Sequence, residues 1–106
     1  MGLLFYNGTI TTTTSEQNLF SVTGSAHYAT YIYTHNMASG DTMVIKIYVT
    51  DVNATTERLY QTITLVDAQT DPAGFISFLP ATTYRVSIQK TVGTNRAFTW
   101  LRAEVT

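Results

Sequence analysis

The two histidines, His27 and His35, are the side chains in this sequence best suited to proton transfer or metal binding. Both fall on one predicted strand, and their even spacing of eight residues places them on the same face. At ~3.3 Å per residue they lie about 25 Å apart, which is too far for one ion to bind both. We therefore expect two exposed or hydrogen-bonded histidines and no metal site.

The acidic residues fall mostly at predicted strand ends and in loops: Glu16, Asp41, Asp51, Glu57, Asp67, Asp71 and Glu104. Aspartate is common there because its side chain caps turns by binding nearby backbone groups. Asp67 and Asp71 share one loop and offer oxygen ligands to calcium, but their spacing fits no calcium-binding loop. The sequence has no cysteine, which excludes thiolate nucleophiles, thiolate zinc sites and disulfides. We predict no catalytic residue, no cofactor and no metal; a hydrolase would need His or acidic groups to converge from separate loops.

Tyrosines provide the remaining candidates for a site. Tyr31, Tyr33 and His35 line one face of a predicted strand, and Tyr60 adds to them if its own strand faces the same way. Such side chains can form a partly buried wall of the core, a protein interface, or a platform that stacks on sugar rings. The first alternative buries the bodies of the rings and exposes their hydroxyls.

Alternating apolar and polar residues, interrupted by turn residues, predict the elements that position these side chains. Leu59, Ile63 and Leu65 share one face of their strand, and Asn7-Gly8 reads as a hairpin turn that ends the first strand. The expected strands cover residues 3–6, 18–22, 28–34, 43–50, 58–66, 75–79, 84–89 and 98–105. The sequence therefore predicts an all-β protein: a single β-sandwich or jelly-roll-like domain of seven or eight antiparallel strands. Alternation alone does not distinguish a jelly roll from an immunoglobulin-like strand order.

Composition limits the partners of this domain. Charged residues make up 12% of the chain, about half the usual ~25%, and the net charge is −1. Nucleic-acid and anionic-membrane binding need clustered cations, so neither is expected. No apolar run approaches the ~20 residues that span a bilayer, and residues 1–6 do not form a signal peptide. Low charge with 21 threonines is typical of a chain whose surface meets another protein.

The first 15 residues form an N-terminal strand or an extended arm, and residues 16–106 form the sandwich domain. The segment is uncharged up to residue 15 and prone to form strands, so it suits pairing with a neighbour's sheet. Its apolar side chains, the candidate assembly residues, are Leu3, Leu4, Phe5 and Ile10.

Two stretches have a distinctive order of elements. Residues 36–49 (NMASGDTMVIKIYV) form a loop, a Gly-Asp pair and an alternating strand. Residues 84–100 (YRVSIQKTVGTNRAFTW) form a strand, a Gly-Thr-Asn-Arg turn and an aromatic strand. Together they resemble segments of small virion-associated proteins of tailed phages and related environmental viruses. The resemblance implies a capsid, decoration or head–tail structural component of the virion, assembled in the host cytoplasm beside a major capsid protein.

Two hypotheses follow. The first is a viral structural protein that acts through contacts with copies of itself, as a trimer, and with the capsid. The second is a carbohydrate-binding or host-adhesion module, in which Tyr31, Tyr33 and Tyr60 stack on a glycan. The first predicts self-association, and the second predicts a change in Tyr or Trp fluorescence on sugar binding.

Overall fold

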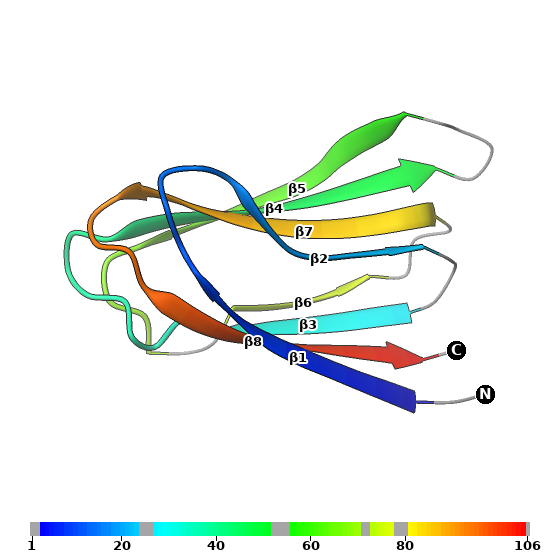
Figure 1. Ribbon diagram of the computed structural model, residues 1–106, viewed down its shortest axis with the longest axis horizontal. Coiled ribbons are helices and arrows are strands. Elements are labelled where there is room, and N and C mark those ends of the chain that lie inside the picture. Colours follow the sequence, from blue (N-terminus) through cyan, green and yellow to red (C-terminus); the bar gives the residue numbers. More distant parts are fainter. Residues whose placement is uncertain (1–2, 24–26, 52–55, 71–72, 78–80, 106) are drawn as a thin grey trace.

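The computed structural model describes residues 3–23, 27–51, 56–70, 73–77 and 81–105, and all its regular elements are strands. The strands are β1 (Leu3–Thr11), β2 (Gln17–Thr23), β3 (His27–Tyr33), β4 (Thr42–Asp51), β5 (Glu57–Val66), β6 (Ala73–Ser77), β7 (Ala81–Val92) and β8 (Ala97–Val105). They form two layers along the long axis of the molecule (Figure 1). The predicted all-β sandwich is confirmed, with eight strands among the residues described.

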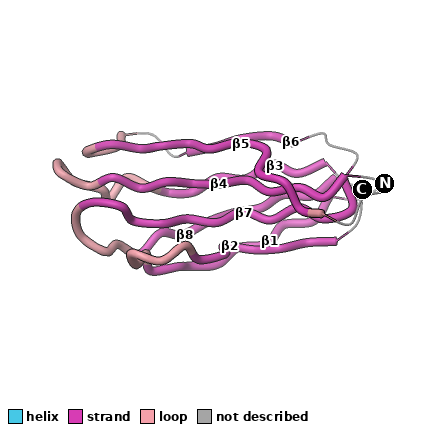
Figure 2. The backbone as a smooth tube through the Cα atoms, turned by 90° about the horizontal axis from the view of Figure 1, so that it is seen from above, coloured by secondary structure: helices cyan, strands magenta, loops and turns pink. Residues whose placement is uncertain are grey.

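Strand order identifies the sandwich as a jelly roll. Sheet A has the order β1-β8-β3-β6 and sheet B has the order β2-β7-β4-β5, and every pairing is antiparallel. Figure 2, a view from above, shows the strands of sheet B side by side in front of those of sheet A. Most connections therefore cross from one sheet to the other, and only β4 and β5 follow each other within a sheet. Two four-stranded sheets linked in this way are the jelly-roll arrangement, which settles the choice that alternation left open.

The core lies between the two sheets and follows the predicted alternation. In β4, Met43, Ile45 and Ile47 are fully buried, while the residues between them are partly exposed. β7 likewise buries Tyr84, Val86 and Ile88, although Ser87 between the last two is also buried, and β3 and β8 supply Ile32 and Phe98 from the other sheet. A fully buried side chain of this size contributes roughly 1.5–3 kcal/mol, so these inward faces hold the two sheets together.

The predicted turn at Asn7-Gly8 is wrong, because β1 runs through it without a break. Gly8 lies opposite Trp100 of β8. A Cβ atom at residue 8 would lie 2.8 Å from Trp100 Cζ2 and 2.9 Å from its Nε1, closer than real Cβ contacts allow. The glycine therefore makes room for the indole ring, which packs against Phe20 at a ring-centroid distance of 5.2 Å.

The predicted face of Leu59 is also wrong. The pairing of β4 with β5 shifts between Ile47 and Tyr48, which lie opposite Gln61 and Leu59, so that Tyr60 is the extra residue of a bulge. The bulge reverses the alternation, and Leu59 leaves the face that it was expected to share with Ile63. Leu59 and Tyr60 are 52% and 53% exposed.

Asp41 connects the loops at the end of the sandwich away from the two termini. Its buried carboxylate accepts hydrogen bonds from the backbone amides of Ala38 (2.9 Å) and Thr94 (3.0 Å) and from Arg96 Nε (2.6 Å). These bonds, those from the backbone first, lower the pKa of Asp41 to about 2. Gly93 adopts a positive φ of 98° beside this carboxylate, where a Cβ would meet Asp41 Oδ1.

Candidate interaction surface on sheet A

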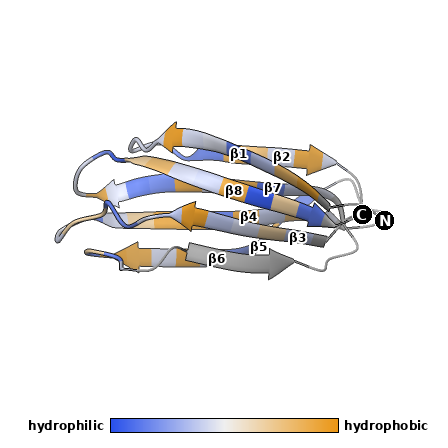
Figure 3. Cartoon of the chain, turned by 90° about the horizontal axis from the view of Figure 1, so that it is seen from below, coloured by the Kyte–Doolittle hydropathy of each residue, from blue (hydrophilic) through white to orange (hydrophobic). Residues whose placement is uncertain are grey.

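The outward face of sheet A is built by three aligned strands. In an antiparallel sheet, residues opposite one another share a face, so register places the side chains in rows. The rows are Phe5–Ala103–Ala29, Asn7–Leu101–Tyr31 and Thr9–Thr99–Tyr33. Figure 3 views the sandwich from the side of this sheet.

Three aromatic side chains dominate this face. Phe5 is 62% exposed, Tyr31 is 45% exposed and Tyr33 is 38% exposed. Tyr31 and Tyr33 alternate with the buried residues Thr30 and Ile32, which point into the core. These two tyrosines therefore point away from the core and are only partly buried, and their exposure is sufficient for either a protein interface or a sugar-binding platform.

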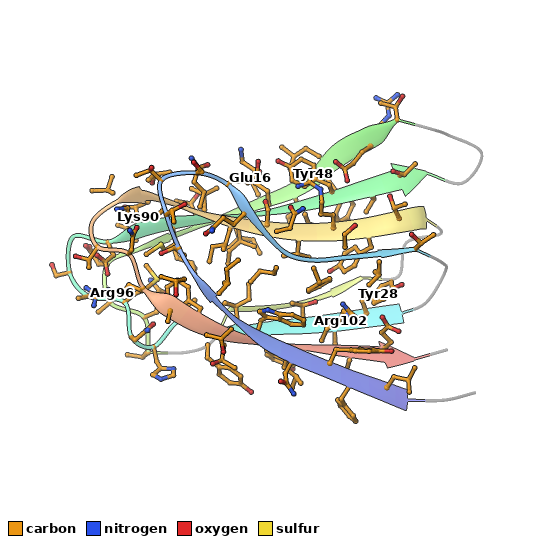
Figure 4. The ribbon with its side chains drawn as sticks, viewed as in Figure 1. Glu16, Tyr28, Tyr48, Lys90, Arg96 and Arg102 are labelled. Atoms are coloured by element: carbon orange, nitrogen blue, oxygen red, sulfur yellow. The ribbon has the colours of Figure 1, made fainter. Side chains whose placement is uncertain are left out.

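No Asp, Glu, Lys or Arg belongs to the outward rows of sheet A. The strands of this sheet contain only two such residues, Arg102 and Glu104, and both lie in the inward rows of β8. They contact each other, Nε to Oε1, at 3.1 Å, and both side chains are nearly buried. The Arg102 guanidinium also lies over the rings of Tyr6 (4.2 Å) and Phe20 (4.7 Å), between the two sheets (Figure 4). The charges of sheet A are thus enclosed, and its outer surface is uncharged.

Sheet B has the opposite character. On its outer face, Arg85 donates hydrogen bonds to both oxygens of Glu57 (2.7 and 3.0 Å) and to Asn18 Oδ1 (2.7 Å). This pairing lowers the pKa of Glu57 below its usual value. The same guanidinium lies 3.9 Å from the centre of the Tyr48 ring.

A second part of this network surrounds Glu16. Its carboxylate accepts hydrogen bonds from Ser87 Oγ and from Tyr48 Oη (2.6 Å), and these bonds, the one from Ser87 first, lower its pKa. Figure 4 shows Glu16 and Tyr48 on the side of sheet B that faces away from sheet A. The outer face of sheet B thus carries an ion pair and charge-assisted hydrogen bonds, as an ordinary solvated surface does.

β1, which forms one edge of sheet A, is unusual in exposing apolar side chains on both of its faces. Within the described part of the chain its backbone pairs along one side only, with β8. Leu4 and Tyr6 belong to the inward rows and Phe5 to the outward row, yet all three are exposed. Exposed apolar side chains on both faces are unusual for an edge strand, since edge strands usually carry charges, prolines or bulges.

The predicted assembly residues separate into two groups. Leu4 and Phe5 are exposed, whereas Ile10 packs against the core and is not available as part of a free arm. The side chain of Leu3 lies outside those that the structure describes. Residues 3–11, predicted as a strand or an arm, form a strand of the sandwich itself.

The predicted set of Tyr31, Tyr33, His35 and Tyr60 does not form one surface. Tyr31 and Tyr33 lie on sheet A, and His35 is exposed in the turn that follows them. Tyr60 lies on β5, at the edge of sheet B. A platform that combines Tyr60 with the other two tyrosines is therefore not formed.

Groups that could bind a metal are dispersed. Asp67 Oδ1 accepts a hydrogen bond from the backbone amide of Gly40 at 2.8 Å, the capping role expected of a loop aspartate. Asp71 and the side chain of His27 lie outside the described residues. Among the side chains that the structure does describe, no three His, Asp or Glu gather closely enough to hold an ion. Likewise, none of the described segments is a helix long and apolar enough to cross a membrane.

Comparisons with known proteins find similarity in fold but not in sequence. No family model matches the sequence, and no curated protein matches it significantly. Among solved structures, a chain from the disulfide-linked pili formed by Bacillus endospore appendages is similar, with a TM-score of 0.56. It is 16% identical in sequence, over 97% of this chain and 88% of that chain. At this identity the likeness shows a shared sandwich fold.

Viral particle proteins are also similar. Chains from the infectious bursal virus-derived T=1 particle and from the VP2 subviral particle of infectious bursal disease virus have TM-scores of 0.49 and 0.47. They are 14% and 13% identical, each over 98% of this chain but only 31% and 32% of their own length. This chain therefore spans about a third of the viral chains that it matches.

Proposed function

We propose that this protein is a structural subunit that builds a larger assembly by binding copies of itself through the sheet A side of the sandwich. The observation that carries the proposal is the contrast between the two outer faces. Sheet A exposes Phe5, Tyr31 and Tyr33 without any Asp, Glu, Lys or Arg beside them, whereas the outer face of sheet B carries charged residues, among them the Arg85–Glu57 ion pair. Interface centres are enriched in aromatic residues and depleted of charges, as this face is.

The same proposal includes the kind of assembly to which the subunit belongs. The two stretches that resemble virion-associated proteins favour a component of a virus particle, either a decoration protein or a minor capsid protein beside a major capsid protein. Similarity in fold to viral particle chains and to a pilus chain agrees with a role as a structural subunit. It does not distinguish a virus particle from a pilus. Since these 106 residues contain no cysteine, the contacts they make are not disulfide-linked, unlike those of the pili. The proposal assigns no catalytic step to the chain.

Tyr31→Glu tests the proposal. The ring projects outward beside Leu101, so the substitution should change the free energy of unfolding by no more than about 0.5 kcal/mol. A carboxylate buried in a contact between copies would have to lose its water, and we expect association through this face to be abolished. The matched control is Thr62→Glu, an exposed residue opposite Lys46 on the outer face of sheet B.

Light scattering after size-exclusion chromatography gives the native mass of the three proteins. The proposal predicts the same number of copies for the unaltered protein and for Thr62→Glu, and fewer copies for Tyr31→Glu. If the two variants have the same mass, the sheet A face is not the contact.

A carbohydrate-binding role is the second candidate, and one observation favours it. Tyr31 and Tyr33 are exposed two residues apart on one uncharged face, with the hydroxyl of Thr99 in the same row as Tyr33. Aromatic rings flanked by hydroxyl groups suit a ligand with both apolar and polar faces, such as a sugar. Titration with a glycan panel, followed by tyrosine fluorescence, would show quenching in the unaltered protein and none in a Tyr31→Ala variant. A flat titration for every glycan removes this candidate.

A further inference from the structure

We infer that two copies of this chain join by antiparallel pairing of β1 with β1 of the second copy, so that their A sheets form one continuous eight-stranded sheet. This inference rests on the proposed function and specifies its first contact. It starts from Leu4, Phe5 and Tyr6, which are exposed on both faces of an edge strand. The side chains of a strand added at this edge would pack beside these three on both faces of the sheet, as cross-strand neighbours do.

The other edges of the sandwich are less suited to pairing. β5 begins with Glu57 and Arg58 and carries the bulge at Tyr60, and β2 has a register shift between Asn18 and Phe20. β6 has only five residues. Charges, bulges and shortness are the devices by which edge strands avoid pairing. β1 has none of them, since its nine residues pair with β8 in unbroken register.

Symmetry selects β1 itself as the partner. Near a twofold axis, a residue of one copy lies close to the same residue of the second copy. A charged residue there would therefore face a like charge. β1 contains no charged residue. Antiparallel pairing centred on Phe5 sets Phe5 opposite Phe5 and Leu4 opposite Tyr6 of the second copy. Cross-strand aromatic pairs of this kind stabilise sheets.

The area of the uncharged face gives an independent reason for pairing. Four strands at ~4.8 Å spacing and seven or eight residues at ~3.3 Å give a face of roughly 450–500 Å² for one copy. A stable interface buries about 800 Å² on each partner. One A sheet is therefore too small, whereas the continuous sheet of two copies offers about twice its area. Edge pairing thus makes the face large enough for the further contacts of an assembly.

Single substitutions test the pairing better than deletion of the strand, because deletion would uncover β8. Phe5→Lys places a charge at the proposed axis, where it would face a second lysine. The matched control is Leu59→Lys, a comparably exposed position on the β5 edge of sheet B. In dilute solution, sedimentation should give two copies for the unaltered chain and for Leu59→Lys, and one copy for Phe5→Lys.

Cysteine variants test the register, since an introduced thiol is unique in this cysteine-free chain. With the axis at Phe5, the two residues 5 have Cα atoms about 4.5–5.5 Å apart, within the range that a disulfide spans. Two residues 7 would lie about 13 Å apart, from four residues at ~3.3 Å. Under mild oxidation, Phe5→Cys should form a covalent dimer and Asn7→Cys should not.

The outcomes separate this inference from the proposed function. If the unaltered chain associates but Phe5→Lys does not weaken it, or if the smallest assembly contains three copies, β1 pairing is wrong while self-association stands. Cross-linking of Asn7→Cys in place of Phe5→Cys overturns the axis at Phe5. If the unaltered chain stays a single copy, both the inference and the proposed function fail.

Discussion

Gly8 offers a sharp test of how the sequence builds this sandwich. The structure assigns it to close approach of β1 to the Trp100 ring, since a Cβ would lie 2.8–2.9 Å from three atoms of the indole. Gly8→Ala therefore forces the ring to move against Phe20, at the boundary of the core. Overpacking of this kind costs typically 1–3 kcal/mol. Replacing glycine by alanine within a strand returns about 0.5–1 kcal/mol.

The net expectation is a loss of about 1 kcal/mol in the free energy of unfolding, or about 4–8 °C in Tm for a domain of this size. Urea denaturation followed by fluorescence measures it well, because Trp100 is the only tryptophan and reports on its own surroundings. The matched control, Asn7→Ala, alters the neighbouring exposed residue and should leave Tm within about 2 °C. If Gly8→Ala were as stable as the unaltered protein, with unchanged Trp emission, the explanation of this glycine would be refuted.

Three further predictions concern charged groups and the sheet A face. The pKa of Asp41 is lowered to about 2, so its carboxylate stabilises the fold above pH ~4, and this contribution is lost as the pH falls through about 2. The difference in free energy of unfolding between the unaltered protein and Asp41→Asn, measured by urea denaturation, should therefore shrink from pH 5 to pH 2. A difference that stays constant over this range would contradict the prediction. Glu104→Gln leaves the nearly buried Arg102 without its ion-pair partner and should lower the free energy of unfolding by about 3 kcal/mol. A loss below 1 kcal/mol in the free energy of unfolding would mean that the two rings around Arg102 stabilise its charge without the carboxylate. Tyr33→Lys, on the uncharged face, should weaken self-association at least tenfold without lowering Tm by more than about 2 °C, and equal association of variant and unaltered protein in sedimentation would count against that face.

The class of fold followed from the sequence because alternation is a local property. In β4 and β7 each inward side chain can be identified from its neighbours two residues away, and the structure buries those residues. The errors arose where a distant strand decides the local conformation. Asn7-Gly8 has the composition of a turn, but residue 8 is glycine because a side chain there would clash with Trp100. Trp100 lies 92 residues further along the chain and opposite Gly8 in β8.

The candidate surface was only partly predictable for the same reason. The low charge of the chain indicated a protein contact, and Tyr31, Tyr33 and Phe5 were identified by residue type. Their shared face depends on the pairing of β1 and β3 with β8, which no local pattern encodes. The separation of Tyr60 onto the other sheet depends on strand order, and the burial of Arg102 and Glu104 depends on the register of β8. One signal was available: the strands of sheet A contain no other Asp, Glu, Lys or Arg.

The central claim is that this protein assembles with copies of itself, and the mass of the unaltered protein in solution tests it most directly. Sedimentation equilibrium over a wide range of concentrations measures that mass without a label or a surface. The account predicts a weight-average mass above the 11.8 kDa of one chain that rises with concentration toward a multiple of that value. A mass that stays at 11.8 kDa up to the highest concentration would contradict it.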